Sequence, residues 1–439
     1  MSLAELKQVS LRVVAAALSA ADPGAAVRRS LVAAGQGFTV CGREYRPGGI
    51  LTLAAVGKAA SGMADAAIEI LGSRVSRGIV VLPQGYPCTR HRGLEVLEAG
   101  HPVPNEGGRA AAGRVWDLAA QMQESDILLL LLSGGGSSLL PLPYPPLSLD
   151  DKIECTNLLL RSGASIREIN TVRKHLSAIK GGRLAARTRG TIITLAISDV
   201  VGDQLGFISS GPAVPDPTTF ADAAGVLARY DLLESVPAAV RSLIEEGVAG
   251  RVPETPKALP GRFTAEVIAS SGIAVEAAAE EAQRQGFPGI VLTTFLEGEA
   301  REAGRLMASV AREVQLHGRP AAPPVCIFAA GETTVTVKGS GKGGRNQEIA
   351  LAAGIELSGE AGLILASFAT DGRDGNTDAA GGFASGETVA AGRRKGLDPR
   401  ACLTANNTHA FLSATGDLIV TGPTGTNVND ITFVLVENR

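Results

Sequence analysis

The chain has 439 residues, of which 45% are hydrophobic and 19% charged, and its formal net charge is −3. These values are typical of a soluble globular protein of two or three domains, and the lack of a basic arm or patch argues against nucleic-acid binding. Five widely spaced cysteines without a CxxC pair indicate a reduced, cytoplasmic protein, and no apolar run is long enough to span a membrane.

Strand-like and helix-like patterns alternate along the first 250 residues. Residues 1–20 have the periodicity of an amphipathic helix, not the pattern of a signal peptide. In a strong helix pattern further on, Ser165 and Glu168 predict a capping box, and Gly181 and Gly182 predict the end. Strands are predicted at 50–57, 78–82, 127–132 and 191–198, and helices from the first strand to residue 71 and at 107–123 and 165–182.

A proline-rich segment, residues 251–262, is the predicted linker, so we expect one domain at 1–250 and a second at 251–439. The alternation on both sides of it predicts an α/β fold of two domains with mostly parallel sheets, and we expect a cleft between the domains. Beyond the linker, strands are predicted at 265–270, 289–294, 325–330, 334–338 and 363–370, and helices at 272–285, 298–317 and 345–357.

Glycines, hydroxyls, a lysine and carboxylates follow the predicted strands. Ligands of open α/β sheets gather beyond the carboxyl ends of strands, so these positions are candidate site residues. Ordinary turn chemistry explains any one of them, but together they favour binding of phosphates and a divalent cation. The segments are Gly57-Lys58, Ser133 to Ser138, Ser198-Asp199, Ser270-Ser271, Gly331-Glu332-Thr333 and Asp371.

The loop SGGGSS follows the most apolar of the predicted strands. Its successive backbone amides and three hydroxyls are the groups of an anion-binding nest, so we expect it to hold nucleotide phosphates. As a dinucleotide fingerprint it fails, because Leu139 stands where the third glycine belongs. The residues of this loop are Ser133, Gly134, Gly135, Gly136, Ser137 and Ser138.

The segment TVTVKGSGKGGRNQEIALA, residues 334–352, joins a predicted strand to a predicted helix through a glycine-rich turn. It fails as a GxxxxGK[ST] phosphate loop, and although it matches GxGxxG, the acidic residue expected about 20 positions later is not well placed. Lys342 and Arg345 favour phosphoryl transfer, which needs added cations. Nucleotide contacts are expected at Gly341, Gly343 and Gly344.

Two further groups of charged residues are candidates. The segment ATDGRDGNTDAAGG has carboxylates spaced as in a calcium loop, but it lacks that loop's glycine and final glutamate, which excludes calcium. Two interpretations stay open: one carboxylate binds Mg²⁺, or the carboxylates cap turns. Basic residues on the polar side of the helix at 165–182 are expected to face solvent, unless a few hold an anionic substrate. The acids are Asp371, Asp374 and Asp378, and the basic residues Arg167, Arg173, Lys174, Lys180 and Arg183.

Taken together, long segments of the sequence resemble the class II glycerate kinases, whose C-terminal part is called the MOFRL domain. These segments run from about residue 10 to 436 and include VGKAASGMA, GHPVPNEGG, LLSGGGSSLLPLP, INTVRKHLSAIKGG, AAGETTVTVKGSGKGGRNQE and DLIVTGPTGTNVNDI. The resemblance implies a Rossmann-like N-terminal domain, a C-terminal MOFRL domain, and phosphorylation of D-glycerate by ATP with Mg²⁺ or another divalent cation, commonly to 2-phosphoglycerate.

The resemblance also implies roles for particular residues. The essential lysine of the family's GK motif and arginine of its GGRNQE motif match Lys58 and Arg345. We expect Asp199 or Asp371 to bind the metal or to take the hydroxyl proton, and these two roles stay unassigned. Substrate contacts are expected from Arg173, Glu332, Thr333 and Asn346.

The sequence leaves two alternative functions and the assembly open. Some members of the family carry the older label hydroxypyruvate reductase, which would make the chain an NAD(P)H-dependent enzyme. A catalytically idle relative that only binds the ligands is the other alternative. We expect a monomer or homodimer that acts on a small molecule and a nucleotide and has no nucleic-acid or membrane partner.

Overall fold

The computed structural model describes residues 1–259 and 262–438. By their mutual contacts the residues form two compact units: a continuous unit of residues 23–268, and a two-segment unit of residues 1–22 with 269–439. This division differs from the boundary predicted at residue 250, because the N-terminal helix and the strand at 263–269 each join the other unit. Over the described ranges, no helix is both long and apolar enough to cross a membrane.

The continuous unit is built on a six-stranded sheet with the order β6-β5-β4-β7-β8-β9. All pairings from β6 to β8 are parallel. The chain order reverses between β4 and β7, so their carboxyl ends form a topological switch point. This order is that of a Rossmann fold and confirms the predicted fold class. The strands are β4 (Leu51–Val56), β5 (Val75–Pro83), β6 (Leu94–Ala99), β7 (Ile127–Leu132), β8 (Thr191–Ile197) and β9 (Phe263–Ala269).

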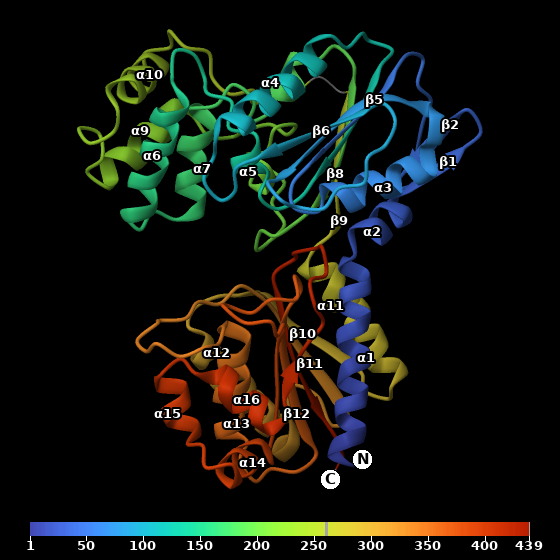
Figure 1. Ribbon diagram of the computed structural model, residues 1–439, viewed down its shortest axis with the longest axis vertical. Helices are drawn as coiled ribbons and strands as arrows, with labels where there is room; N and C mark the ends of the chain where they lie inside the picture. The colour runs from blue at the N-terminus through green and yellow to red at the C-terminus, as the bar shows by residue number, and fades with distance from the viewer. Residues whose placement is uncertain (260–261, 439) are drawn as a thin grey trace. The chain divides into compact units, whose positions relative to one another are not determined.

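The helices of this unit pack in two places (Figure 1). Helix α3 packs on β4 and β5 and α4 on β6, whereas α6, α7, α9 and α10 share a separate hydrophobic core. The elements are α2 (Pro23–Ser30), α3 (Ala60–Leu71), η1 (Gly72–Arg74), α4 (Glu106–Ala120), α5 (Gly136–Leu139), α6 (Leu149–Arg161), α7 (Ile166–His175), α8 (Arg183–Arg187), η2 (Ile208–Ser210), α9 (Phe220–Arg229), α10 (Ala238–Val248) and a small sheet of β1 (Leu31–Ala34), β2 (Gly37–Val40) and β3 (Arg43–Tyr45).

The helix predicted at 165–182 is correct at its start and wrong at its end. The capping box of Ser165 and Glu168 is present, but α7 ends at His175. Beyond it the chain pairs with a distant segment instead: Ser177 forms a β-bridge with Pro143. A pairing partner more than thirty residues away therefore overrides the local helical pattern.

The two-segment unit contains a second six-stranded sheet, with the order β10-β11-β15-β12-β13-β14. Only β10 and β11 pair in parallel, and the other four pairings are antiparallel. The prediction of a mostly parallel sheet is wrong here, because the last strand of the chain enters the centre of the sheet. The strands are β10 (Gly289–Leu296), β11 (Val325–Gly331), β12 (Leu363–Ala369), β13 (Gly381–Ser385), β14 (Leu418–Ile419) and β15 (Asp430–Val436).

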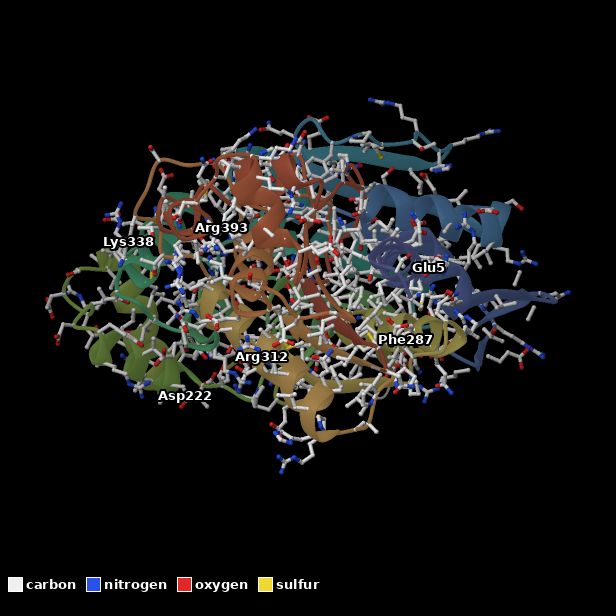
Figure 2. The ribbon with its side chains drawn as sticks, turned by 90° about the horizontal axis from the view of Figure 1, so that it is seen from below. Glu5, Asp222, Phe287, Arg312, Lys338 and Arg393 are labelled. Carbon is white, nitrogen blue, oxygen red and sulfur yellow. The ribbon has the colours of Figure 1, made fainter. Side chains whose placement is uncertain are left out.

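Helices lie on both faces of this second sheet (Figure 1). Helix α1 packs along α11 on one face, and α12 and α13 pack together on the other. Figure 2 shows the first pair from below, with Glu5 of α1 and Phe287 just after α11 labelled. The helices are α1 (Leu3–Ala21), α11 (Ser271–Arg284), α12 (Ala300–His317), α13 (Arg345–Glu356), α14 (Thr388–Arg394), α15 (Pro399–Thr404) and α16 (Thr408–Thr415).

The strand predicted at 334–338 is not formed. Thr334 makes one isolated bridge, to Glu299. The backbone amide of Thr336 donates to the carboxylate of Glu299, and that of Lys338 donates to the side chain of Asn406. Side chains from elsewhere in the fold therefore take the bonds that a neighbouring strand would have made.

Candidate functional site

The first group of candidate residues lies at the switch point of the continuous unit. The backbone amide of Lys58 donates to the carbonyl of Gly134 at 2.9 Å, and that of Ala59 to Ser133 Oγ at 3.0 Å. Gly57 has a φ of 131°, and a Cβ there would overlap Ser133 Oγ, so only glycine fits. The ends of β4 and β7 are thus joined, and the Lys58 segment lies on the SGGGSS loop.

The ammonium of Lys58 does not take part in holding the fold together. Throughout 1–259 and 262–438 it has no hydrogen bond and no ion pair. His101 lies close by; burial and then the charge of Lys58 lower the pKa of His101, which keeps that imidazole neutral near pH 7. A partly buried cation at a switch point, with no anionic partner from the described chain, is suited to an anionic ligand.

Some polar groups of the SGGGSS loop are bonded within the fold, and others have no partner there. Ser133 is buried and accepts the Ala59 amide, and the hydroxyl of Ser137 bonds to that of Ser210 at 2.6 Å. The amides of Gly134 and Gly135, in contrast, have no acceptor among the residues that the structure describes. These two amides are the part of the predicted nest that remains open to a ligand.

Two serines next to this loop hold a conformation that the sequence did not reveal. Ser209 and Ser210 have φ of 51° and 59°, the left-handed region that non-glycine residues rarely adopt. Ser210 is fully buried, and its hydroxyl donates to Asn170 at 2.8 Å. Strained backbone of this kind collects at functional sites, and the punctuation SSGP was the available signal.

Asp199, at the end of β8, also reaches the loop. A Cβ on Gly134 would overlap the carboxylate of Asp199, so the side chain lies directly against the loop backbone. Lys58, the SGGGSS loop and Asp199 are therefore brought together by three neighbouring strands. This clustering at one sheet edge is what the positions after the strands predicted.

The basic residues after position 165 are mostly not on a solvated face. Lys174, Lys180 and Arg183 are buried. Lys174 pairs with Asp216 at 3.2 Å, whereas Lys180 donates to the carbonyl of Ser137 at 2.8 Å. The default expectation of solvent is wrong for these three: Lys174 lies on a buried face of α7, and Lys180 and Arg183 lie in the segment that enters the fold after α7 ends early.

The second group of candidate residues lies in the two-segment unit, around Arg345 at the start of α13. Its guanidinium forms a two-pronged ion pair with Asp430 and donates to Glu332 at 2.6 Å. Burial lowers the pKa of Arg345, but the two carboxylates outweigh burial and raise it. Burial raises the pKa of Asp430 to about 7 against the pull of Arg345. One N–H on each terminal nitrogen of Arg345 remains for a ligand.

The glycine-rich segment before Arg345 is tied into the fold by its amides. Gly341 donates to the carbonyl of Ala405, and Gly343 donates to the side chain of Asn376. A Cβ on Gly344 would overlap Asp374. The glycines therefore let the backbone approach its neighbours, and a nucleotide contact by them stays a prediction that competes with these bonds.

The N-terminus of α13 already holds a carboxylate. Asp374 is 1% exposed and accepts the backbone amides of Asn346 at 3.0 Å and Gln347 at 2.9 Å. It occupies the place where a dinucleotide loop holds its pyrophosphate. The sequence left Mg²⁺ binding and capping open for the segment from Asp371 to Asp378. Asp374 acts as a cap.

The remaining predicted residues of this unit have different surroundings. Asn346 is fully buried, and its side chain bonds to Asp374 and Ser367. Thr333 is buried, and its hydroxyl has no partner within the described part of the chain. Asp371 is partly buried and accepts the amide of Arg373 at 2.9 Å. Substrate contacts by Asn346 and Thr333 stay predictions.

The described residues contain no group of three histidine, cysteine or carboxylate side chains that could hold a metal ion. Mg²⁺ does not need one, since it is commonly bound by one or two carboxylates together with substrate phosphates and water. The carboxylate of Asp199, placed against the SGGGSS loop, fits this kind of site.

Fold and site geometry define an α/β protein with anion-binding groups at the ends of its strands. Two family models match it: a domain of unknown function, DUF4147, over residues 9–245, and the MOFRL family over residues 325–430. The glycerate 2-kinase of Pyrococcus horikoshii is 46% identical over 436 residues, covering 99% of this chain and 98% of that protein.

A crystal structure of glycerate kinase from Thermotoga maritima has a TM-score of 0.89 at 42% identity and covers 98% of this chain and 99% of that one. A protein of Agrobacterium vitis, provisionally named a hydroxypyruvate reductase, is 42% identical and covers 98% of this chain and 94% of that protein. The chain belongs to the glycerate 2-kinase family, in which a DUF4147 domain is joined to a MOFRL domain.

Proposed function

We propose that this chain transfers the γ-phosphoryl group of ATP to the 2-hydroxyl of D-glycerate, giving 2-phosphoglycerate and ADP. The observation that carries the proposal is the unpaired ammonium of Lys58 at the switch point, on a loop with two open amides. Phosphoryl transfer is achieved mainly by positioning and by neutralising charge, and these groups supply both. The glycerate kinases of P. horikoshii and T. maritima support the choice of substrate.

In this mechanism Lys58 neutralises the phosphoryl group as it moves. The hydroxyl oxygen of glycerate attacks the γ-phosphorus, the bond to the bridging oxygen of ADP breaks, and the hydroxyl proton passes to a carboxylate. Asp199 or Asp371 takes that proton. Because Asp199 lies against the SGGGSS loop, it is the better placed of the two to hold Mg²⁺, which would neutralise the phosphate oxygens.

Arg345 serves the same reaction by clamping an anion. Its ion pairs with Asp430 and Glu332 fix the plane of the guanidinium and leave two N–H groups for a carboxylate or phosphate. Glu332 and Asp430 therefore act as positioning residues for Arg345. The sequence analysis included Glu332 but missed Asp430, which lies 85 residues beyond Arg345 in the chain.

A hydroxypyruvate reductase is the second candidate, favoured by the name of the A. vitis relative. Such an enzyme needs a dinucleotide pyrophosphate at the N-terminus of a helix. The glycine pattern before α13 would be that loop, but the first free amides of the helix donate to Asp374. The SGGGSS loop lacks the third glycine, so neither loop favours a nicotinamide cofactor.

One assay series separates the candidates. The purified protein is incubated with D-glycerate, ATP and Mg²⁺, and the product is identified by phosphorus NMR; hydroxypyruvate with NADH or NADPH is followed in parallel by absorbance. We expect 2-phosphoglycerate and no nicotinamide oxidation. A 3-phosphoglycerate signal would keep the kinase and overturn the position of attack, whereas nicotinamide oxidation without ADP would overturn the kinase. Ligand binding without any turnover would identify an idle relative.

A further inference from the structure

A cavity of about 370 Å³ opens beside the SGGGSS loop, entirely within the continuous unit. One side is a single face of α6, including Lys152 and Ile153, and the other includes His101 and Val103. The lining includes Gly135, where a Cβ would be 3.5 Å from the Cγ of Lys58. The cavity therefore shares Gly135 with the surroundings of Lys58, the residue assigned to phosphoryl transfer, although Lys58 itself does not line it.

Three cations line this cavity, and no aspartate or glutamate from the described ranges lines it. Lys152 and Lys180 are 7% and 3% exposed. Lys152 donates to the carbonyls of Pro141 and Leu142, and Lys180 to that of Ser137, so neither ammonium has an anionic partner. The guanidinium of Arg173 has no hydrogen bond or ion pair in the described ranges. Buried like charges without counter-ions are costly, and a bound anion would relieve that cost.

The size of the cavity indicates a ligand larger than glycerate. Its volume lies in the roughly 300–1,000 Å³ range of pockets for drug-sized molecules. Val103 and Leu160 in its lining are 61% and 57% exposed, so the cavity offers apolar surface to a ligand. A lining that combines cations with apolar side chains matches a nucleotide, which has phosphates for the cations and a base for the apolar side chains.

We propose that this cavity is the nucleoside triphosphate site, in which Lys152, Arg173 and Lys180 hold the phosphates and the apolar wall holds the base. The proposal rests on the proposed function for the identity of ATP as the donor. It places Arg173, expected from the sequence to contact the substrate, on the nucleotide instead. It also adds Lys152, which the sequence analysis did not single out.

The first test compares Lys152→Met and Lys180→Met with Lys257→Met, an exposed lysine of the same unit whose side chain is bonded outside the cavity. Calorimetry measures the binding of ATP without D-glycerate, so the result does not depend on turnover. We expect about tenfold weaker binding or more in the two cavity variants and no change in the control. Unchanged ATP affinity in both cavity variants overturns the proposal, and so does weaker binding of 2-phosphoglycerate in variants that keep the wild-type affinity for ATP.

The second test uses the unmodified protein, so it does not depend on how a variant folds. Burial, followed by the charges of Arg173 and Arg183, lowers the pKa of Lys152 to about 7, and burial lowers that of Lys180 well below its ordinary value. Cys155 on α6 stays neutral because burial raises its pKa to about 12, and His101 is neutral near pH 7. A polyanion favours the charged ammoniums, so binding raises their pKa.

ATP binding at pH 8 should therefore take up protons, and affinity should fall as the pH rises above about 7. Calorimetry in buffers of different ionisation enthalpy measures the uptake. Binding of ATP without proton uptake, at an affinity that does not change between pH 7 and pH 9, overturns the proposal. If D-glycerate is not phosphorylated but ATP binds with this uptake, the proposed function fails and the cavity assignment stands.

Discussion

Lys58 and Arg345 differ in what holds them. Lys58 is positioned only through its backbone, by the bond to Gly134, and its ammonium contacts no partner in the described ranges. Arg345 is positioned through its side chain, by Asp430 and Glu332. The two residues therefore need different substitutions, although both were predicted from the sequence as essential residues of equal rank.

Replacing Lys58 by methionine removes a charge that stabilises nothing else. We expect Lys58→Met to lower kcat by about 100-fold or more, because a preorganised charge at the transferring group is lost. The melting temperature should stay within about 2 °C of the wild type, since no structural bond is broken. Near-normal turnover in a folded variant would remove Lys58 from the mechanism.

Arg345→Ala would leave the buried carboxylate of Asp430 without its partner, which costs about 3–5 kcal/mol of stability. Lost activity in that variant would not distinguish catalysis from unfolding. Arg345→Lys keeps the charge and removes the planar fork, so we expect at least tenfold lower turnover with a much smaller shift of the urea midpoint. Full turnover in Arg345→Lys would show that the fork is not needed.

Helix α13 illustrates how one distant side chain fixes an element. Its N-cap residue is Gly344, which has no side chain to cap the helix. Asp374 takes over that function and bonds to two backbone amides and two side-chain amides. The helix that presents Arg345 therefore depends on a carboxylate about thirty residues away.

Asp374→Ala should cost about 1–3 kcal/mol of unfolding free energy, because two helix amides and two buried side-chain amides lose their acceptor. Urea denaturation measures the loss. Asp378→Ala is the matched control, since that carboxylate is 85% exposed and makes one weak pair with His409. Equal stability of the two variants would contradict the capping role.

At the level of the entire chain, the first helix belongs with the last third of the sequence. Helix α1 packs along α11 and touches β12, so residues 1–22 complete the unit formed by 269–439. A linker prediction based on proline content cannot detect this, because the partners of α1 are more than 240 residues away.

Leu6→Ala should lower the stability of the two-segment unit by about 2–5 kcal/mol, since Leu6 is 2% exposed on the packed face of α1. Leu11→Ala, on the same helix and 42% exposed, should change it by less than about 0.5 kcal/mol. In Leu6→Ala, the rate of amide hydrogen exchange should rise first in α11, which packs on α1, and not in β4 of the other unit. Faster exchange in β4 alone would contradict the division of the chain into these units.

The sequence by itself determined the alternation of strands and helices, the buried strands of the first sheet, and the polar residues that follow them. These features depend on neighbours two to four positions apart, which periodicity and capping patterns record. The long motifs around Lys58 and Arg345 also sufficed to identify the family.

Only the tertiary structure decided how distant residues are paired. It placed β15 between antiparallel neighbours in the centre of a mixed sheet and ended α7 at His175. It also placed Asp374 at the N-terminus of α13, where a dinucleotide loop would hold a phosphate. It also buried Lys152 and Lys180 around one cavity, whereas the sequence predicted solvent for Lys180 and singled out nothing at Lys152. Contacts between segments far apart in the chain decide the direction of a strand, the burial of a side chain and the partner of a charged group. Local sequence patterns do not predict these contacts.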